Sequence, residues 1–179
     1  MLTIHMPACE LWDEKNECFI HTKPVVLKLE HSLISVSKWE SKWHIPFLDT
    51  KLTAEQSLDY IRCMALNTDV DPNVYLALSA KQTEEIMKYI NDPMTATTIK
   101  ETADNKKSSK FTTSELIYYY MIQFGIPHEF EKWHLNRLVT LIRVCSEESK
   151  PQKKRSKSQI EKDYEEINRR NKAKYHTRG

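Results

Sequence analysis

The stretch EKWHLNRLVTLIRVC, residues 131–145, combines one histidine, two arginines and one tryptophan with a dense run of apolar side chains. Placed on a helix at about 100° per residue, the apolar side chains gather on one broad arc and the polar ones lie opposite. This distribution predicts an amphipathic helix whose apolar face packs against the protein core. The apolar arc holds Leu135, Leu138, Val139, Leu141, Ile142 and Cys145, and the polar side holds Asn136, Arg137, Thr140 and Arg143.

Two further side chains of this stretch bear on the choice between a catalytic and a packing role. Trp133 falls one helical turn before Arg137, where a guanidinium can stack on the face of an indole. His134 falls at the edge of the apolar arc, and a histidine there is most often a core or boundary residue with one satisfied nitrogen. A catalytic histidine needs a partner acid or nucleophile, and this helix offers none. The packing interpretation is therefore favoured.

The composition of the chain argues against large classes of enzyme. Its 179 residues are 40% hydrophobic and 29% charged, as expected for one soluble domain with room for an appendage. It holds only two glycines, Gly125 and Gly179, whereas average usage is about 7%. Phosphate-binding loops, dinucleotide fingerprints and nucleophile elbows all require glycine, and no serine or cysteine lies in an activating context. We therefore expect a protein that is not an enzyme.

Four side chains near the N-terminus are of the types that bind zinc. His5, Cys9, Cys18 and His21 suit a tetrahedral site by ligand chemistry. Their spacing matches no standard zinc finger, and on an extended strand the first two would lie about 13 Å apart. We therefore expect surface histidines and incidental reduced cysteines, and we assign no metal and no cofactor.

The pattern along the rest of the chain predicts a β-hairpin followed by helices. Residues 1–31 are rich in β-branched side chains with partial alternation, which indicates a hairpin with a polar connection at 8–17. Its second strand should start after Pro24 or lie at an edge. Helix-start signals then recur. They are Ser32, the capping boxes Thr53/Gln56, Ser79/Gln82 and Thr112/Glu115, and Asp71 with Pro72. The signals before residue 91 predict helices over 32–43, 53–66, 71–78 and 79–90. A candidate short strand at 94–99 and an exposed loop at 102–110 follow.

The segment 112–145 is the expected centre of the fold. Apart from Gln123, residues 116–124 are apolar or aromatic all round, so this helix is either central or covered by a partner. Gly125 suits a left-handed position just after the helix, and Pro127 prevents the helix from continuing. The helix at 131–145 should then return beside the first one as an αα-hairpin.

Charge separates the chain into an acidic body and a basic tail. Residues 1–149 carry 16 Lys and Arg against 21 Asp and Glu, a net charge of −5, and residues 150–179 carry 11 against 4, a net charge of +7. In the tail, Ile160, Tyr164 and Ile167 form a thin apolar stripe that cannot hold a helix alone in water. We interpret 1–149 as a mainly α domain of the α+β type, and 150–179 as a basic helical arm that is mobile unless it docks.

The candidate contact residues are aromatic or cationic. Aromatic side chains on a small helical body are most often core, but a surplus of them also makes a docking surface, and the sequence does not separate the two. The basic tail could bind nucleic acid through phosphates, although a solvated arm that engages an acidic protein surface is the commoner case. The candidates for partner binding are Trp39, Trp43, Tyr118, Tyr119, Tyr120, Phe124, Trp133, Arg137, Lys153, Lys154 and Arg155.

Several blocks of this sequence resemble one protein family, the tail assembly chaperones encoded by long-tailed bacteriophages. The resemblance spans roughly residues 25–150 and the end of the tail. The blocks are packing blocks, and none is a chemical motif. They are LEHSLISVSKWESKWHIPFL (29–48), LDYIRCMALN (58–67), MTATTI (94–99), SELIYYYMI (114–122), KWHLNRLVTLIRVC (132–145) and TRG (177–179).

The resemblance implies a small, mostly helical protein that works in the host cytoplasm during tail morphogenesis. Members of the family are thought to bind the tape measure protein, keep its apolar helices from aggregating and help recruit tail tube subunits. Self-association is a further expectation, and neither a membrane nor a nucleic acid is an expected partner. The family supplies no catalytic residues. The alternative left open is a permanent structural protein of the tail, baseplate or head–tail region, which would stay in the virion.

Overall fold

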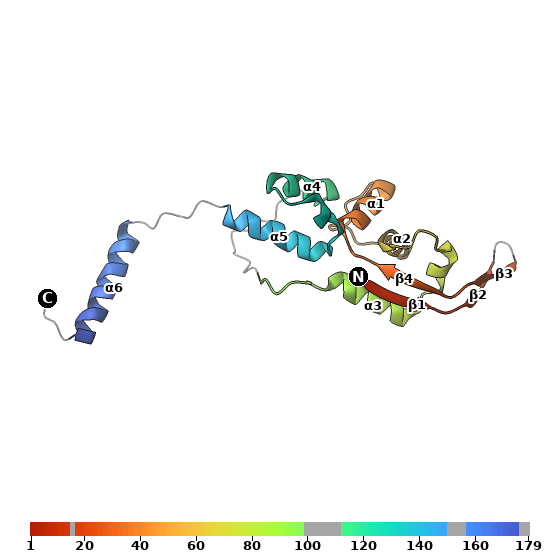
Figure 1. Cartoon of the computed structure of the whole chain (residues 1–179), viewed down its shortest axis with the longest axis horizontal. Helices are drawn as coiled ribbons and strands as arrows, with labels where there is room; N and C mark the ends of the chain where they lie inside the picture. Colours follow the sequence, from red (N-terminus) through yellow and green to blue (C-terminus); the bar gives the residue numbers. More distant parts are fainter. Residues whose placement is uncertain (15–16, 99–111, 150–156, 176–179) are drawn as a thin grey trace. The chain divides into compact units, whose positions relative to one another are not determined.

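The computed structural model describes residues 1–14, 17–98, 112–149 and 157–175 (Figure 1). The chain divides into two units, Met1–Glu147 and Glu148–Gly179. The first is mainly helical with an N-terminal β-hairpin, which confirms the α+β fold expected from the sequence. Its strands are β1 Leu2–Met6, β2 Cys9–Asp13, β3 Cys18–Thr22 and β4 Val25–Leu29, and its α-helices are α1 Leu33–Trp43, α2 Ala54–Met64, α3 Ala80–Asn91, α4 Ser114–Gln123 and α5 Leu135–Glu148. Two 3-10 helices, η1 Pro72–Ala77 and η2 His128–Lys132, lie between them.

The four strands form one antiparallel ribbon that keeps a single register across an interruption. β1 pairs with β4 and β2 pairs with β3, and the same register continued between the two ladders places Pro7 opposite Pro24. Proline has no backbone N–H to donate, so two facing prolines break the ladder at this point. The expectation that a strand starts after Pro24 is confirmed. The expected polar connection at 8–17 is wrong, because Leu11 and Trp12 pair with Ile20 and Phe19 as part of a strand.

The inner face of the β1–β4 ladder supplies part of the core. Burial alternates along both strands, with Ile4, Met6, Leu27 and Leu29 inside. The outer edge of β4 is covered by the chain that follows α2. The N–H of Glu30 donates to the carbonyl of Met64 at 2.9 Å, and the N–H of Leu66 donates to the carbonyl of Lys28 at 2.8 Å. This covering brings the end of α2 beside Glu30.

Most of the predicted helix starts are confirmed. Ser32 caps α1, and the boxes Thr53/Gln56 and Ser79/Gln82 cap α2 and α3. Asp71 and Pro72 start a helix as expected, although it is the 3-10 helix η1. The predicted Thr112/Glu115 box is wrong, because α4 begins one residue later and its N-cap is Thr113. The N–H of Thr112 instead donates to Asp49 Oδ2 at 2.6 Å, which holds this residue outside the helix.

Helix α4 packs against α1 and buries Ile117 and Met121 there. Gly125 follows it with a φ of +64°, the left-handed conformation that the sequence predicts. The chain then passes through η2 before α5 begins. The expected close αα-hairpin is therefore wrong: α1, not α5, is the main packing partner of α4.

The remaining expectations have mixed outcomes. Residues 94–98 contain no strand, and Met94 has a φ of +49°, outside the range of extended backbone. Ile99 and the loop expected at 102–110 lie outside the described residues. In the second unit the helix α6 spans Lys157–Tyr175. Along its described side chains, Tyr164 and Ile167 are exposed. Across the described ranges, no helix is both long and apolar enough to span a membrane.

Candidate docking site

The two tryptophans of α1 belong to the structural centre of the molecule. Trp39 is fully buried, and its Nε1 donates a hydrogen bond to the carbonyl of Gln56 at 3.0 Å. Trp43 stacks on it with a centroid distance of 6.1 Å. The hydrogen bond to Gln56 fastens α1 to α2. Of the two candidates, Trp39 is therefore inaccessible to a partner.

Asp59 of α2 completes this fastening. Trp43 Nε1 donates to its Oδ2 at 2.8 Å, and the ammonium of Lys42 lies 2.5 Å from its Oδ1. Burial opposes ionisation of this carboxyl, but the hydrogen bonds from Lys42 and Trp43 outweigh it and hold the pKa of Asp59 below its ordinary value. Asp59 therefore works as an ionised anchor between the helices.

The aromatic residues of α4 divide between packing and exposure. Tyr118 is half-buried, and its hydroxyl donates to Glu131 Oε2 at 2.9 Å. Tyr120 and Phe124 stack on each other at 6.4 Å and pack at the margin of the core. Tyr119 is 57% exposed and Ile122 is 80% exposed. We call Tyr119 and Ile122, three positions apart on one side of the helix, the α4 outer face.

Helix α5 confirms the amphipathic arc predicted from its sequence. Leu135, Leu138 and Ile142 are buried, whereas Arg137 and Arg143 are exposed. The predicted stacking is also confirmed, since the guanidinium carbon of Arg137 lies 4.0 Å from the ring centroid of Trp133. The ring of Phe130 stacks on Trp133 with a centroid distance of 3.8 Å. Two groups this close to one centroid must occupy opposite faces, so Trp133 is held between Phe130 and Arg137.

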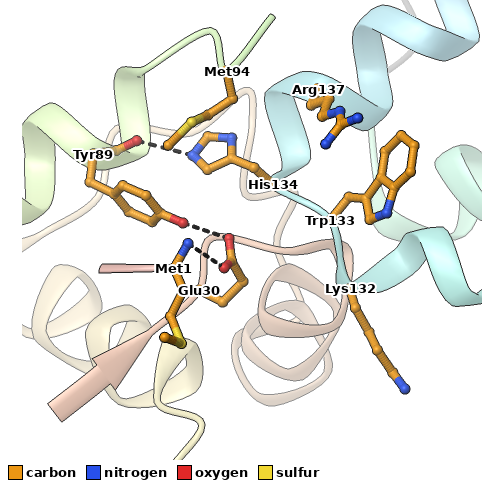
Figure 2. Close-up of a pocket in the computed structure, with 8 residues that line it drawn as sticks. All are labelled: Met1, Glu30, Tyr89, Met94, Lys132, Trp133, His134 and Arg137. Carbon is orange, nitrogen blue, oxygen red and sulfur yellow. Dashed lines mark hydrogen bonds and ion pairs between the residues drawn. The ribbon is translucent and has the colours of Figure 1, made fainter. Parts of the chain in front are cut away.

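Glu30, which follows β4, joins three parts of the fold. Its Oε2 lies 2.8 Å from the amino group of Met1, and its Oε1 accepts a hydrogen bond from the hydroxyl of Tyr89 at 2.6 Å. Burial of the hydroxyl, its hydrogen bond to Glu30 and the charge of that carboxylate raise the pKa of Tyr89. Figure 2 shows the three groups meeting beneath His134.

His134 behaves as the sequence predicts, as a buried residue with one satisfied nitrogen. Its Nε2 lies 3.0 Å from the carbonyl oxygen of Tyr89, and its Nδ1 has no hydrogen-bond partner among the described residues. Burial lowers the pKa of His134, so the ring is neutral at pH 7 and Nε2 carries the hydrogen that it donates. The ring also lies 5.0 Å from that of His31.

His31 is the second buried imidazole of this cluster. Its Nδ1 is hydrogen-bonded to the hydroxyl of Tyr60, and its carbonyl accepts from the N–H of Leu135 at 2.7 Å. Burial, followed by the proximity of His134, lowers the pKa of His31 to about 3. Both rings are therefore packing groups at neutral pH, positioned where the start of α5 meets the start of α1.

A cavity of about 290 Å³ opens above the Glu30 cluster (Figure 2). Its rim carries cationic groups, because Arg137 and Lys132 both lie on it. A second cavity, of about 220 Å³ and more apolar, lies beside the first. The first is lined by Met1, Glu30, Tyr89, Met94, Lys132, Trp133, His134 and Arg137.

The zinc-type residues of the ribbon do not converge. Cys9 pairs with Thr22 at one end of the β2–β3 ladder, and Cys18 pairs with Asp13 at the other. His21 instead lies 3.2 Å from Glu10 on the exposed face. Within the described residues, no three His, Cys, Asp or Glu side chains are placed to hold a metal ion.

Sequence reasoning found part of this site and missed the rest. It identified Trp133 and Arg137, which are four residues apart in the sequence, although Trp133 lies just before α5 and not within it. It missed Glu30, Tyr89 and Lys132, which are brought together by the tertiary fold and lie in stretches without a motif. Lys153, Lys154 and Arg155 lie outside the described residues.

Comparison with models of protein families, with curated proteins and with solved structures finds no match to this chain. The geometry offers groups for recognition: a stacked guanidinium, lysines on a cavity rim and an exposed apolar helix face.

Proposed function

We propose that this protein is a non-enzymatic tail assembly chaperone of a long-tailed bacteriophage. In this role it binds the tape measure protein in the host cytoplasm and assists the morphogenesis of the tail tube. The resemblance of its sequence blocks supports the proposal. Two of these blocks, 29–48 and 132–145, supply much of the core around Trp39 and Leu138, as packing blocks should.

The observation that carries the proposal is the position of α4. Its residues 116–122 are all apolar or aromatic, which fits either a central helix or one covered by a partner. The structure gives it a single buried side, packed against α1, and leaves Tyr119 and Ile122 in solvent. An exposed aromatic and aliphatic pair on a rigid helix is a suitable contact for the apolar helices of a client.

Co-expression with the tape measure protein of the same phage tests this proposal. We expect the tape measure protein to stay soluble and to co-purify with the wild-type chain, and the double variant Tyr119→Ser, Ile122→Ser to hold much less of it. Leu76→Ser is the control, because Leu76 is about as exposed as Tyr119 but lies on η1. An insoluble tape measure protein with nothing co-purifying would contradict the proposal.

The second candidate function is a permanent structural protein of the tail, baseplate or head–tail region. One observation favours it: α6 exposes Tyr164 and Ile167, and such a helix becomes stable when it packs against neighbouring subunits. Purified virions distinguish the two functions. A chaperone is absent from them, whereas a structural protein is present in a fixed copy number.

A further inference from the structure

The two cavities beside Glu30 form one groove. They share Met1, Glu30 and Lys132 as lining residues, so they adjoin along this line. One half contains the Trp133–Arg137 stack. The other half is apolar and opens next to the end of α2. We call the two halves together the Glu30 groove.

The rim of the Glu30 groove carries positive charge that the fold does not neutralise. Lys38, Lys132 and Arg137 are exposed there, and within the described part of the chain none of them forms an ion pair. The one carboxylate in the groove, that of Glu30, is already engaged by the Met1 amino group and the Tyr89 hydroxyl. Such a concentration of cations is notable on a body whose net charge is −5 over residues 1–149.

Arg137 is presented in a fixed position. Its guanidinium lies against one face of Trp133, and Phe130 supports the other face. Stacking leaves the edge of a guanidinium free to donate hydrogen bonds, and the planar group matches a carboxylate in two-pronged geometry. Because the side chain is already held, less conformational entropy is lost when it binds an anion.

The apolar half of the groove is suited to a hydrophobic side chain. Its volume of about 220 Å³ is bounded by aliphatic and sulfur-containing side chains, and Leu66 at its edge is 55% exposed. Lys38 and Lys132 lie on the rim of this same half. An apolar side chain inserted here would therefore be flanked by cations. Its apolar lining residues include Ile34, Cys63, Met64, Ala65 and Leu66.

We propose that the Glu30 groove binds an acidic amphipathic segment of a partner polypeptide. An apolar side chain of that segment enters the half next to Leu66, and carboxylates beside it pair with Arg137 and Lys132. The inference rests on the proposed function in one respect: the segment that binds the groove is taken to belong to a polypeptide client. It goes further by assigning the chemistry of the recognised segment and a second contact surface apart from the α4 outer face.

Charge and shape together favour a peptide over other occupants. A nucleic acid would use the cations but would place no aliphatic group in the half beside Leu66. A second copy of this chain would have to present acidic and apolar groups together and would give a dimer in solution. Both alternatives are outcomes of the test below.

The test uses two labelled, capped amphipathic peptides and the full-length protein. Both peptides carry leucines along one helical face, and the other positions are glutamate in one peptide and lysine in its counterpart. We expect the glutamate peptide to bind at least about tenfold more tightly by fluorescence anisotropy, with an affinity that falls as salt is added. Equal binding of the two peptides, no binding of either, or displacement of the glutamate peptide by a single-stranded oligonucleotide would overturn the proposal.

Variants locate the binding to the groove. Arg137→Glu and Lys132→Glu should each weaken the glutamate peptide roughly tenfold, and Arg143→Glu, a matched exposed arginine on α5, should change it less than about twofold. Leu66→Ser should weaken binding, and Leu76→Ser should not. All five substituted positions are exposed, and thermal unfolding checks that each variant folds. An equal loss in Arg143→Glu, or a dimer that Arg137→Glu dissociates, would contradict the inference.

The outcomes also separate this inference from the proposed function. If the wild-type protein holds the tape measure protein in solution but shows no preference for the glutamate peptide, the groove assignment fails and the chaperone function stands. If the peptide preference holds but the tape measure protein is not bound, the chaperone function fails and the groove assignment stands.

Discussion

Glu40 of α1 accepts a hydrogen bond from the backbone N–H of Ser114, 2.7 Å from its Oε2, although 74 residues separate the two in sequence. Its other oxygen, Oε1, accepts from the N–H of Phe47 at 2.8 Å. The side chain is buried, and its one carboxyl group pairs a backbone N–H of the turn after α1 and a backbone N–H of the first turn of α4. This contact fixes α4 on α1 and thereby sets which side of α4 remains exposed.

Replacing Glu40 should loosen α4 selectively. Glu40→Gln keeps the size of the side chain but converts one acceptor oxygen into a donor, which leaves a buried N–H without its partner. We expect the free energy of unfolding to fall by about 2 kcal/mol, measured by urea denaturation. Glu84→Gln on the exposed side of α3 is the control and should change it by less than about 0.5 kcal/mol. Equal stability of the two variants would contradict the role given to Glu40.

The same contact explains what the sequence could and could not predict. The caps of α1, α2 and α3 were predictable, because each pairs residues three positions apart in the chain. The sequence predicts the start of α4 one residue too early. Asp49 and Glu40, both distant in sequence, bind the N–H groups of Thr112 and Ser114 and set the true start. Long-range contacts of this kind leave no local pattern.

The candidate site shows the same division. The sequence predicts the stack of Trp133 and Arg137 and the buried position of His134. The helix expected from residue 131 nevertheless begins only at Leu135, and Trp133 lies in extended backbone between η2 and α5. The Glu30 groove was not predictable, because its lining comes from the N-terminus, the residue after β4, and α1, α2, α3, η2 and α5 at once. Whether the aromatic residues of α4 are core or surface was likewise decided by the packing of α4 on α1.

The anchor at Asp59 gives a second prediction. Asp59→Ala removes the acceptor of the Trp43 indole and the partner of the Lys42 ammonium. We expect a loss of about 2 kcal/mol in the free energy of unfolding, because the half-buried indole of Trp43 loses its acceptor. Lys42→Met removes only the exposed partner and should cost about 1 kcal/mol or less. A larger loss for Lys42→Met than for Asp59→Ala would show that the indole contact is unimportant.

The two buried imidazoles predict a stability that depends on pH. Folding lowers the pKa of His31 from 6.5 to about 3 and also lowers that of His134. The unfolded chain therefore binds more protons below pH 6.5. Stability from these groups is fully present above pH 6.5, and it is lost as the pH falls toward 3. Each histidine contributes a slope of at most about 1.4 kcal/mol per pH unit.

Urea denaturation at a series of pH values checks this expectation. His31→Phe should be less stable than the wild type at pH 7, since it loses the hydrogen bond to Tyr60. Its free energy of unfolding should, however, fall less steeply between about pH 6 and pH 4. His5→Gln replaces an exposed histidine and should keep the wild-type slope. A slope unchanged in His31→Phe would show that His31 is not the group that titrates.

The far part of the ribbon provides the last prediction. Trp12 on β2 and Phe19 on β3 are register partners whose rings meet edge to face at 5.0 Å. Both are largely exposed, at 53% and 60%, so little of the ribbon's stability here comes from burial. A cross-strand aromatic pair should supply this stability instead.

In a double-mutant cycle of Trp12→Ala and Phe19→Ala, we expect a coupling energy of about 0.5–1 kcal/mol. A cycle of Glu10→Ala and His21→Ala, whose side chains form the neighbouring exposed pair, should give a smaller value at pH 8. Additive effects of the two aromatic substitutions would mean that the rings touch without stabilising the ribbon, and that the pairing of β2 with β3 depends on its other cross-strand contacts.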